Sequence, residues 1–118
     1  MQNLPKTIQD IFTQSRESDL YNALVAQLKK DFLLANSALE CCDTPSTSDL
    51  VRVLQEAVYT LIQEAFSTYV TLLYVVDVPE SCLSVLDNSD MVKFSKAVSL
   101  LILKREWQKV WFRARGGV

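Results

Sequence analysis

Histidine is absent from the 118 residues of this sequence, and glycine occurs only twice, at positions 116 and 117. Without histidine the chain cannot form a Ser-His-Asp or Cys-His nucleophile, a histidine-ligated zinc site, or the Glu-x-x-His pairs of di-iron bundles. Two glycines cannot build a P-loop or a dinucleotide-binding turn. Because these absences remove most routes to catalysis, we expect neither enzyme activity nor a cofactor.

The three cysteines are not spaced as a disulfide framework or a metal site. Cys41 and Cys42 are adjacent and Cys82 is alone, and adjacent side chains on a helix point in different directions, away from one tetrahedral metal. Glu40 and Asp43 flank the pair, and neighbouring negative charge disfavours a reactive thiolate. We expect small, partly buried side chains here and no metal.

Long apolar runs are missing as well. The longest stretch without a charged residue is the twelve residues between Glu64 and Asp77, whereas a membrane-spanning helix needs about 20. The N-terminal stretch MQNLPKTIQDIF is interrupted by Lys6 and Asp10, so it lacks the apolar segment of a signal peptide. The sequence therefore predicts no transmembrane segment and a cytoplasmic location.

Apolar residues nevertheless make up 49% of the chain, which is typical of a globular protein with a buried core. An all-β domain needs turn residues about every ten positions, and two glycines and three prolines are too few. The composition predicts an all-α fold. We expect one domain over residues 1–118, an up-and-down helical bundle of three long helices and two short ones.

Apolar residues at three- and four-residue spacing place these helices. Ser18 and Ser48 are the expected N-terminal caps of the first two long helices, and the segment DNSD, residues 87–90, supplies a loop and a cap for the last. The polar segment 43–48 is the clearest loop. The expected elements are a short helix that starts at Pro5 and ends or bends in the polar stretch 14–18, long helices over 19–40, 49–76 and 90–114, and a short helix over 79–86.

Residues 69–76, YVTLLYVV, are rich in β-branched and aromatic side chains and could also form a strand. A strand requires a partner, and the sequence contains no second convincing strand. The helical spacing of apolar residues also continues from Leu50 to Val76 without a break. We therefore predict that one helix extends through the whole segment.

One set of residues between Leu72 and Val110 stands out. It consists of an apolar run with Tyr74, then Asp77, and later Arg105-Glu106 followed by Gln108-Lys109-Val110. In this third of the chain the sequence resembles small all-helical bacterial proteins of unassigned function. The resemblance implies a helical fold and a bacterial origin, and it implies no activity.

Charge is distributed unevenly along the chain. Residues 1–90 carry five basic and thirteen acidic residues, whereas residues 91–118 carry seven basic residues and only Glu106 as an acid. The first part therefore has a net charge of −8 and the second of +6. Such opposite charges could pack against each other within one chain, or they could favour antiparallel pairing of two chains.

The closing stretch KREWQKVWFRARGGV permits three interpretations. In the first, its aromatic side completes a buried helix face and the cations stabilise the helix end. It could instead bind nucleic acid, by phosphate contacts and base stacking, although the pI of about 5.0 is unusual for such proteins. A membrane-surface contact is the third interpretation. The candidate contact residues are Lys104, Arg105, Lys109, Trp111, Phe112, Arg113 and Arg115.

The buried-helix interpretation is the one we favour. It predicts that Trp107 is buried near Leu100 and Leu103, and that Arg113 and Arg115 are exposed. The expected helix over 90–114 has an unusually wide apolar face, so it should be central or should meet a partner chain. The leading function is then that of a small helical interaction protein without an active site, which forms a homodimer or binds a protein partner. Nucleic-acid binding is the alternative.

Overall fold

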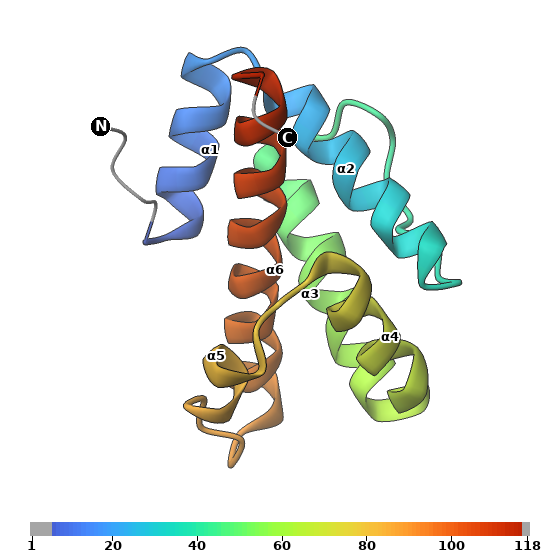
Figure 1. Ribbon diagram of the computed structural model, residues 1–118. Helices are drawn as coiled ribbons and strands as arrows, with labels where there is room; N and C mark the ends of the chain where they lie inside the picture. Colours follow the sequence, from blue (N-terminus) through green and yellow to red (C-terminus); the bar gives the residue numbers. More distant parts are fainter. Residues whose placement is uncertain (1–5, 117–118) are drawn as a thin grey trace.

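A computed structural model describes residues 6–116, and in this part of the chain six α-helices and their connections are present, without a β-strand (Figure 1). The prediction of an all-α fold is therefore confirmed. The helices are α1 (Ile8–Glu17), α2 (Tyr21–Leu34), α3 (Thr47–Glu64), α4 (Phe66–Val76), α5 (Glu80–Ser84) and α6 (Met91–Ala114). Pro5, the expected start of the first helix, lies outside the described residues.

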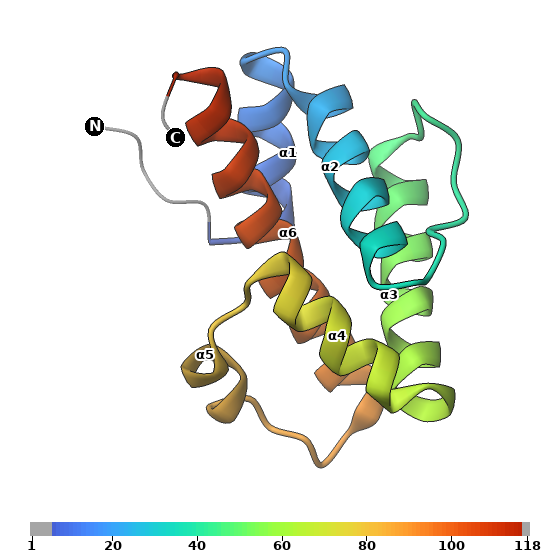
Figure 2. The ribbon, with the colours of Figure 1, turned by 45° about the vertical axis from the view of Figure 1, so that its right-hand side comes forward.

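Helix α6 is the central element, and it packs against α1, α2, α3 and α4. Figures 1 and 2 show that α1, α4 and α6 run in one general direction and that α2 and α3 run in the other. The connection over residues 35–46 returns along the molecule before α3 begins. Because α2 is about 21 Å long, a connection of this length is needed to start α3 near the same end. The directions of successive helices thus do not simply alternate, and the connections between the helices are not all short.

One hydrophobic core joins α1, α2, α3, α4 and α6. The central helix contributes five buried apolar side chains, at Val98, Ile102, Leu103, Trp107 and Val110. The prediction that Trp107 is buried is confirmed, since 2% of it is exposed. The wide apolar face of α6 is therefore covered by the chain's own helices.

The prediction of one continuous helix over 49–76 is wrong, because the helix breaks at Ala65, where φ is −147° and ψ is 62°. A continuous helix of that length would extend about 42 Å, whereas the largest extent of the molecule is 36 Å. At the break the chain folds back, and α4 then buries Leu72, Leu73 and Val76 in the core. The helical prediction for residues 69–76 is confirmed.

The second helix is shorter than expected at both ends. It stops at Leu34, after which Asn36 adopts a left-handed conformation with φ of 65°. Ser18 does not cap it: its hydroxyl donates a hydrogen bond of 2.7 Å to the Gln14 carbonyl, at the end of α1. The helix begins after Asp19, which also has a positive φ, of 59°. The left-handed conformations of Asp19 and Asn36, which Asp and Asn adopt more readily than most residues, therefore set the two ends of the helix.

The caps of the later helices are partly as expected. Asp90 caps α6 by accepting hydrogen bonds from the backbone N–H groups of Val92 and Lys93. At α3 the cap is Ser46, whose hydroxyl accepts from the Asp49 N–H at 3.1 Å, and not Ser48. Among the helices that the structure describes, none has both the length and the apolar character needed to cross a membrane.

Candidate functional site

An open groove with a volume of about 670 Å³ lies between α4, α5 and the start of α6. Figure 2 shows these three elements at one end of the molecule, with α5 separated from α4. Most side chains along the groove are apolar. They include Ile62, Phe66, Val70, Leu73, Tyr74, Leu83, Leu86, Met91 and Phe94. We call this the α4–α5 groove.

One wall of the α4–α5 groove is a row of exposed apolar side chains on α4. Phe66 is 60% exposed, Val70 is 49% exposed and Tyr74 is 86% exposed. These residues are four positions apart, so they lie along one face of the helix. The opposite face carries the buried Leu72 and Val76. Helix α4 is therefore apolar on both sides, and only one side is covered.

The other wall is formed by α5 and the loop that follows it. No residue of this five-residue helix is buried, and its Leu83 is only partly covered. Met91 and Phe94, at the start of α6, complete the wall and are also partly covered. A short helix without buried residues has few packing contacts to hold it. This wall can therefore adjust more readily than the α4 wall.

The charged residues that line the α4–α5 groove are both acidic. They are Asp77, after the end of α4, and Glu80, at the start of α5. Two further exposed carboxylates, Asp87 and Asp90, are next to the lining residues Asn88 and Met91. One of the four, Asp77, is paired with Arg105 at 3.0 Å. One exposed cation, Lys93, is next to the lining residue Phe94. The carboxylates still outnumber the cations, so the rim of the groove has a negative balance.

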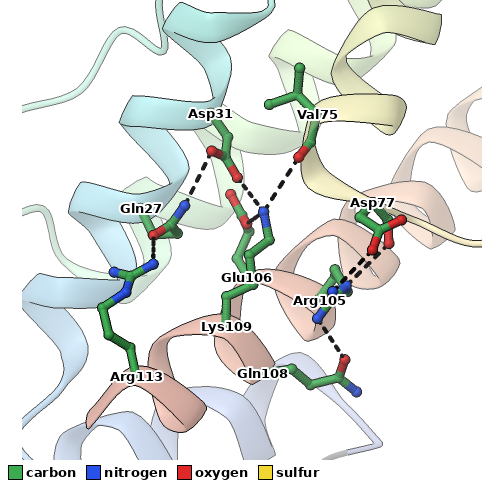
Figure 3. Close-up of polar contacts among 9 residues, drawn as sticks. All are labelled: Gln27, Asp31, Val75, Asp77, Arg105, Glu106, Gln108, Lys109 and Arg113. Atoms are coloured by element: carbon green, nitrogen blue, oxygen red, sulfur yellow. Dashed lines mark hydrogen bonds and ion pairs between the residues drawn. The ribbon is translucent and has the colours of Figure 1, made fainter. Parts of the chain in front are cut away.

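Three of the basic residues of α6 make polar contacts within the chain (Figure 3). Arg105 donates hydrogen bonds to the carbonyl and the carboxylate of Asp77, at 3.2 and 3.0 Å. Lys109 Nζ lies 2.6 Å from Asp31 Oδ2, on α2. Arg113 is exposed, as predicted, but it donates a 2.7 Å hydrogen bond to Gln27 Oε1. Three of the seven candidate contact residues thus join α6 to α2 and to the end of α4.

Glu106 lies at the centre of this polar cluster and is fully buried. Its pKa is raised from 4.5 to about 8, chiefly by burial and next by a hydrogen bond to Asp31, while Lys109 opposes the shift. Neither carboxyl oxygen accepts a hydrogen bond from the described residues, although Lys109 Nζ lies 2.9 Å from Oε1. The raised pKa of Glu106 and the absence of a hydrogen bond accepted by its oxygens both fit a protonated carboxyl that donates to the Asp31 carboxylate.

Asp31 shows the opposite behaviour. Burial by itself would raise its pKa, but hydrogen bonds from Glu106, Lys109 and Gln27 outweigh burial and lower the pKa below 3.8. The cluster therefore combines an ionised Asp31, a cationic Lys109 and a neutral Glu106 at neutral pH. Because Lys109 on α6 pairs with Asp31 on α2, we interpret this arrangement as a packing contact between α2 and α6.

The aromatic residues of the closing stretch lie in different surroundings. Trp107 is buried and its indole N–H donates to Gln14 Oε1 at 3.1 Å. Trp111 packs against the Trp107 ring, and the guanidinium of Arg115 lies 4.4 Å from the Trp111 ring centroid. Phe112 is exposed. The remaining candidate, Lys104, is half-buried beside a smaller groove near Cys82.

Several of these features were missed at the level of sequence. Glu106 follows Leu103 and precedes Val110 on the buried face, so an acid inside an apolar row was a visible signal. Asp31 and Gln27 gave no such signal.

No group of three or more side chains suited to hold a metal ion occurs in residues 6–116.

A scan of protein-family models, a search of curated proteins and a search of solved structures found no match to this chain. The resemblance to small bacterial helical proteins stays a prediction.

Proposed function

We propose that this chain is a small, non-enzymatic helical interaction protein that binds a helical segment of a protein partner in the α4–α5 groove. The observation that carries the proposal is the exposed row of Phe66, Val70 and Tyr74 along that groove. Contiguous apolar surface of this kind typically marks a site of association. A groove beside such a row suits an amphipathic helix, whose apolar side chains recur every three or four residues.

The chain has a second groove, between α3 and α6, which provides a comparison. Its volume is about 500 Å³, and it is lined by Val51, Tyr59 and Val92 together with Arg52, Glu56 and Lys96. Charged side chains of both signs interrupt the apolar surface there, and Arg52 is paired with Glu56 at 3.2 Å. The α4–α5 groove is larger and more continuously apolar, and this favours it as the binding surface.

The test is a titration of ¹⁵N-labelled protein with a synthetic helix-forming peptide that carries Leu at i, i+3, i+4 and i+7 and Gln at its polar positions. We expect chemical-shift changes at amides of α4 and α5. Replacing Phe66→Ser and Tyr74→Ser together should abolish these changes with little loss of stability, because both side chains are exposed. The matched control is Tyr59→Ser, in the second groove.

Either of two results would count against the proposal. Shift changes that were absent at millimolar peptide would show that the groove does not accept a helix. Changes that persisted in the Phe66→Ser, Tyr74→Ser variant but disappeared in Tyr59→Ser would move the binding surface to the second groove.

A further inference from the structure

We propose that the segment bound in the α4–α5 groove is a cationic amphipathic helix of another protein, with Lys or Arg flanking its apolar face. This inference rests on the proposed function of the groove and names the class of partner. It follows from three features: the length of the apolar row, the sign of the charges around it, and the ion pairs and hydrogen bonds that three basic residues of α6 make within the chain.

The length of the row matches a helix of about three turns. From Phe66 to Tyr74 the row covers eight residue steps, or about 12 Å along α4. A helix packed alongside would present anchors at i, i+4 and i+7 or i+8 over the same distance. Met91 and Phe94 in the facing wall supply a flexible and an aromatic contact for these anchors.

The charges around the row favour cations on such a helix. Asp77 and Glu80 line the groove, and Asp87 and Asp90 are exposed in the loop before α6, next in sequence to the lining residues Asn88 and Met91. Asp77 is already paired with Arg105. Each exposed carboxylate adds little affinity by itself, but the net negative charge of the rim attracts a cationic segment and repels an acidic one. The second groove has carboxylate and cationic side chains together, so it offers no such selection.

A second copy of this chain fits the groove less well. Pairing of two identical grooves would bring their acidic rims together, and like charges across an interface are unfavourable. The basic stretch of α6 could supply cations instead, but Arg105 and Lys109 form internal ion pairs and Arg113 donates to Gln27. A cationic segment of a different protein meets neither obstacle.

The experiment compares three peptides with the same Leu face and with Lys, Gln or Glu at the polar positions, each titrated into the ¹⁵N-labelled protein at low salt. We expect the Lys peptide to bind roughly 5- to 30-fold more tightly than the Gln peptide, with the Glu peptide weakest. In 0.5 M salt the difference should shrink to less than about 3-fold, because exposed charges are screened.

Variants of the acidic rim test whether its carboxylates cause the preference for the Lys peptide. Glu80→Gln combined with Asp87→Asn should reduce the advantage of the Lys peptide and leave binding of the Gln peptide unchanged. Both side chains are exposed, and Asp77 is kept because it holds Arg105. Glu56→Gln, in the second groove, removes one carboxylate charge elsewhere, against two in the rim variant, and controls for general attraction to the chain's net charge of −2.

The outcomes separate this inference from the proposed function. Equal affinity of all three peptides for the groove would leave the groove as a helix-binding site and overturn the cationic preference. An advantage of the Lys peptide that Glu56→Gln reduced as much as the rim variant would also overturn it. If none of the peptides bound, both proposals would fail. A dimer in light scattering that dissociated on Tyr74→Ser would replace the cationic helix by a second copy.

Discussion

Replacing Glu106 by glutamine should stabilise the protein at pH 8 and leave its stability nearly unchanged at pH 5. Glutamine has the shape of a protonated glutamate, and its amide can donate to the Asp31 carboxylate as the protonated carboxyl does. It differs in having no proton to lose. The variant therefore isolates the effect of ionising a fully buried carboxyl.

The magnitude follows from the pKa of Glu106, which rises from 4.5 to about 8 on folding. Between these values the folded chain keeps a proton that the unfolded chain has lost, so the free energy of unfolding falls as pH rises. The slope is about 1.4 kcal/mol per pH unit, and the total loss by pH 8 is about 5 kcal/mol. Above pH 8 this group contributes no further change. The glutamine variant avoids the loss.

The assay is urea denaturation followed by helical circular dichroism at pH 5, 6, 7 and 8. The difference between the Glu106→Gln variant and the parent should grow steadily with pH. Glu56→Gln is the control, since Glu56 is exposed and pairs with Arg52, and its difference should not grow in this way. A Glu106→Gln variant that lost about 3–5 kcal/mol at every pH would refute the reasoning. It would mean that Glu106 is ionised and paired with Lys109.

Three further predictions concern α6. Trp107→Ala should lower the free energy of unfolding by about 3–5 kcal/mol in urea denaturation, whereas Phe112→Ala, which removes an exposed ring, should change it by less than about 1 kcal/mol. Lys109→Met should cost about 3–5 kcal/mol at pH 7, because it leaves the buried Asp31 without its cation; a loss below about 1 kcal/mol would contradict the ion pair. Affinity for a mixed oligonucleotide should be weak and its salt dependence shallow, because Arg105 and Lys109 are held in internal ion pairs; a slope of log affinity on log salt steeper than about −4 would contradict this.

Helical content could be predicted because it depends on local features of the sequence. Few glycines and prolines, apolar residues at helical spacing, and Asp90 as a cap were sufficient to place α6 within one residue of its observed bounds. The break at Ala65 has no such local sign, because alanine favours helix and no proline or glycine is near. Its cause is the burial of Leu72 and Val76 against the rest of the core, which local spacing does not reveal.

The candidate sites depend even more on contacts between distant residues. The basic residues of α6 were visible, but Lys109 pairs with a residue 78 positions away and Arg105 with one 28 positions away. The exposed row on α4 was hidden for another reason. Because α4 is apolar on both sides, the sequence does not say which side is covered; the chain reversal at Ala65 decides this.

The polar contacts of α6 also bear on which surface is left for a partner. A wide apolar face can slide or rotate against its neighbours with little change in buried area. The Lys109–Asp31 ion pair and the hydrogen bond from Trp107 to Gln14 each require one rotation and one register of α6 against α2 and α1. In that register the apolar face of α6 is covered by the chain itself. The wide face that suggested a partner in the sequence is therefore satisfied internally, and the argument for a partner depends on α4.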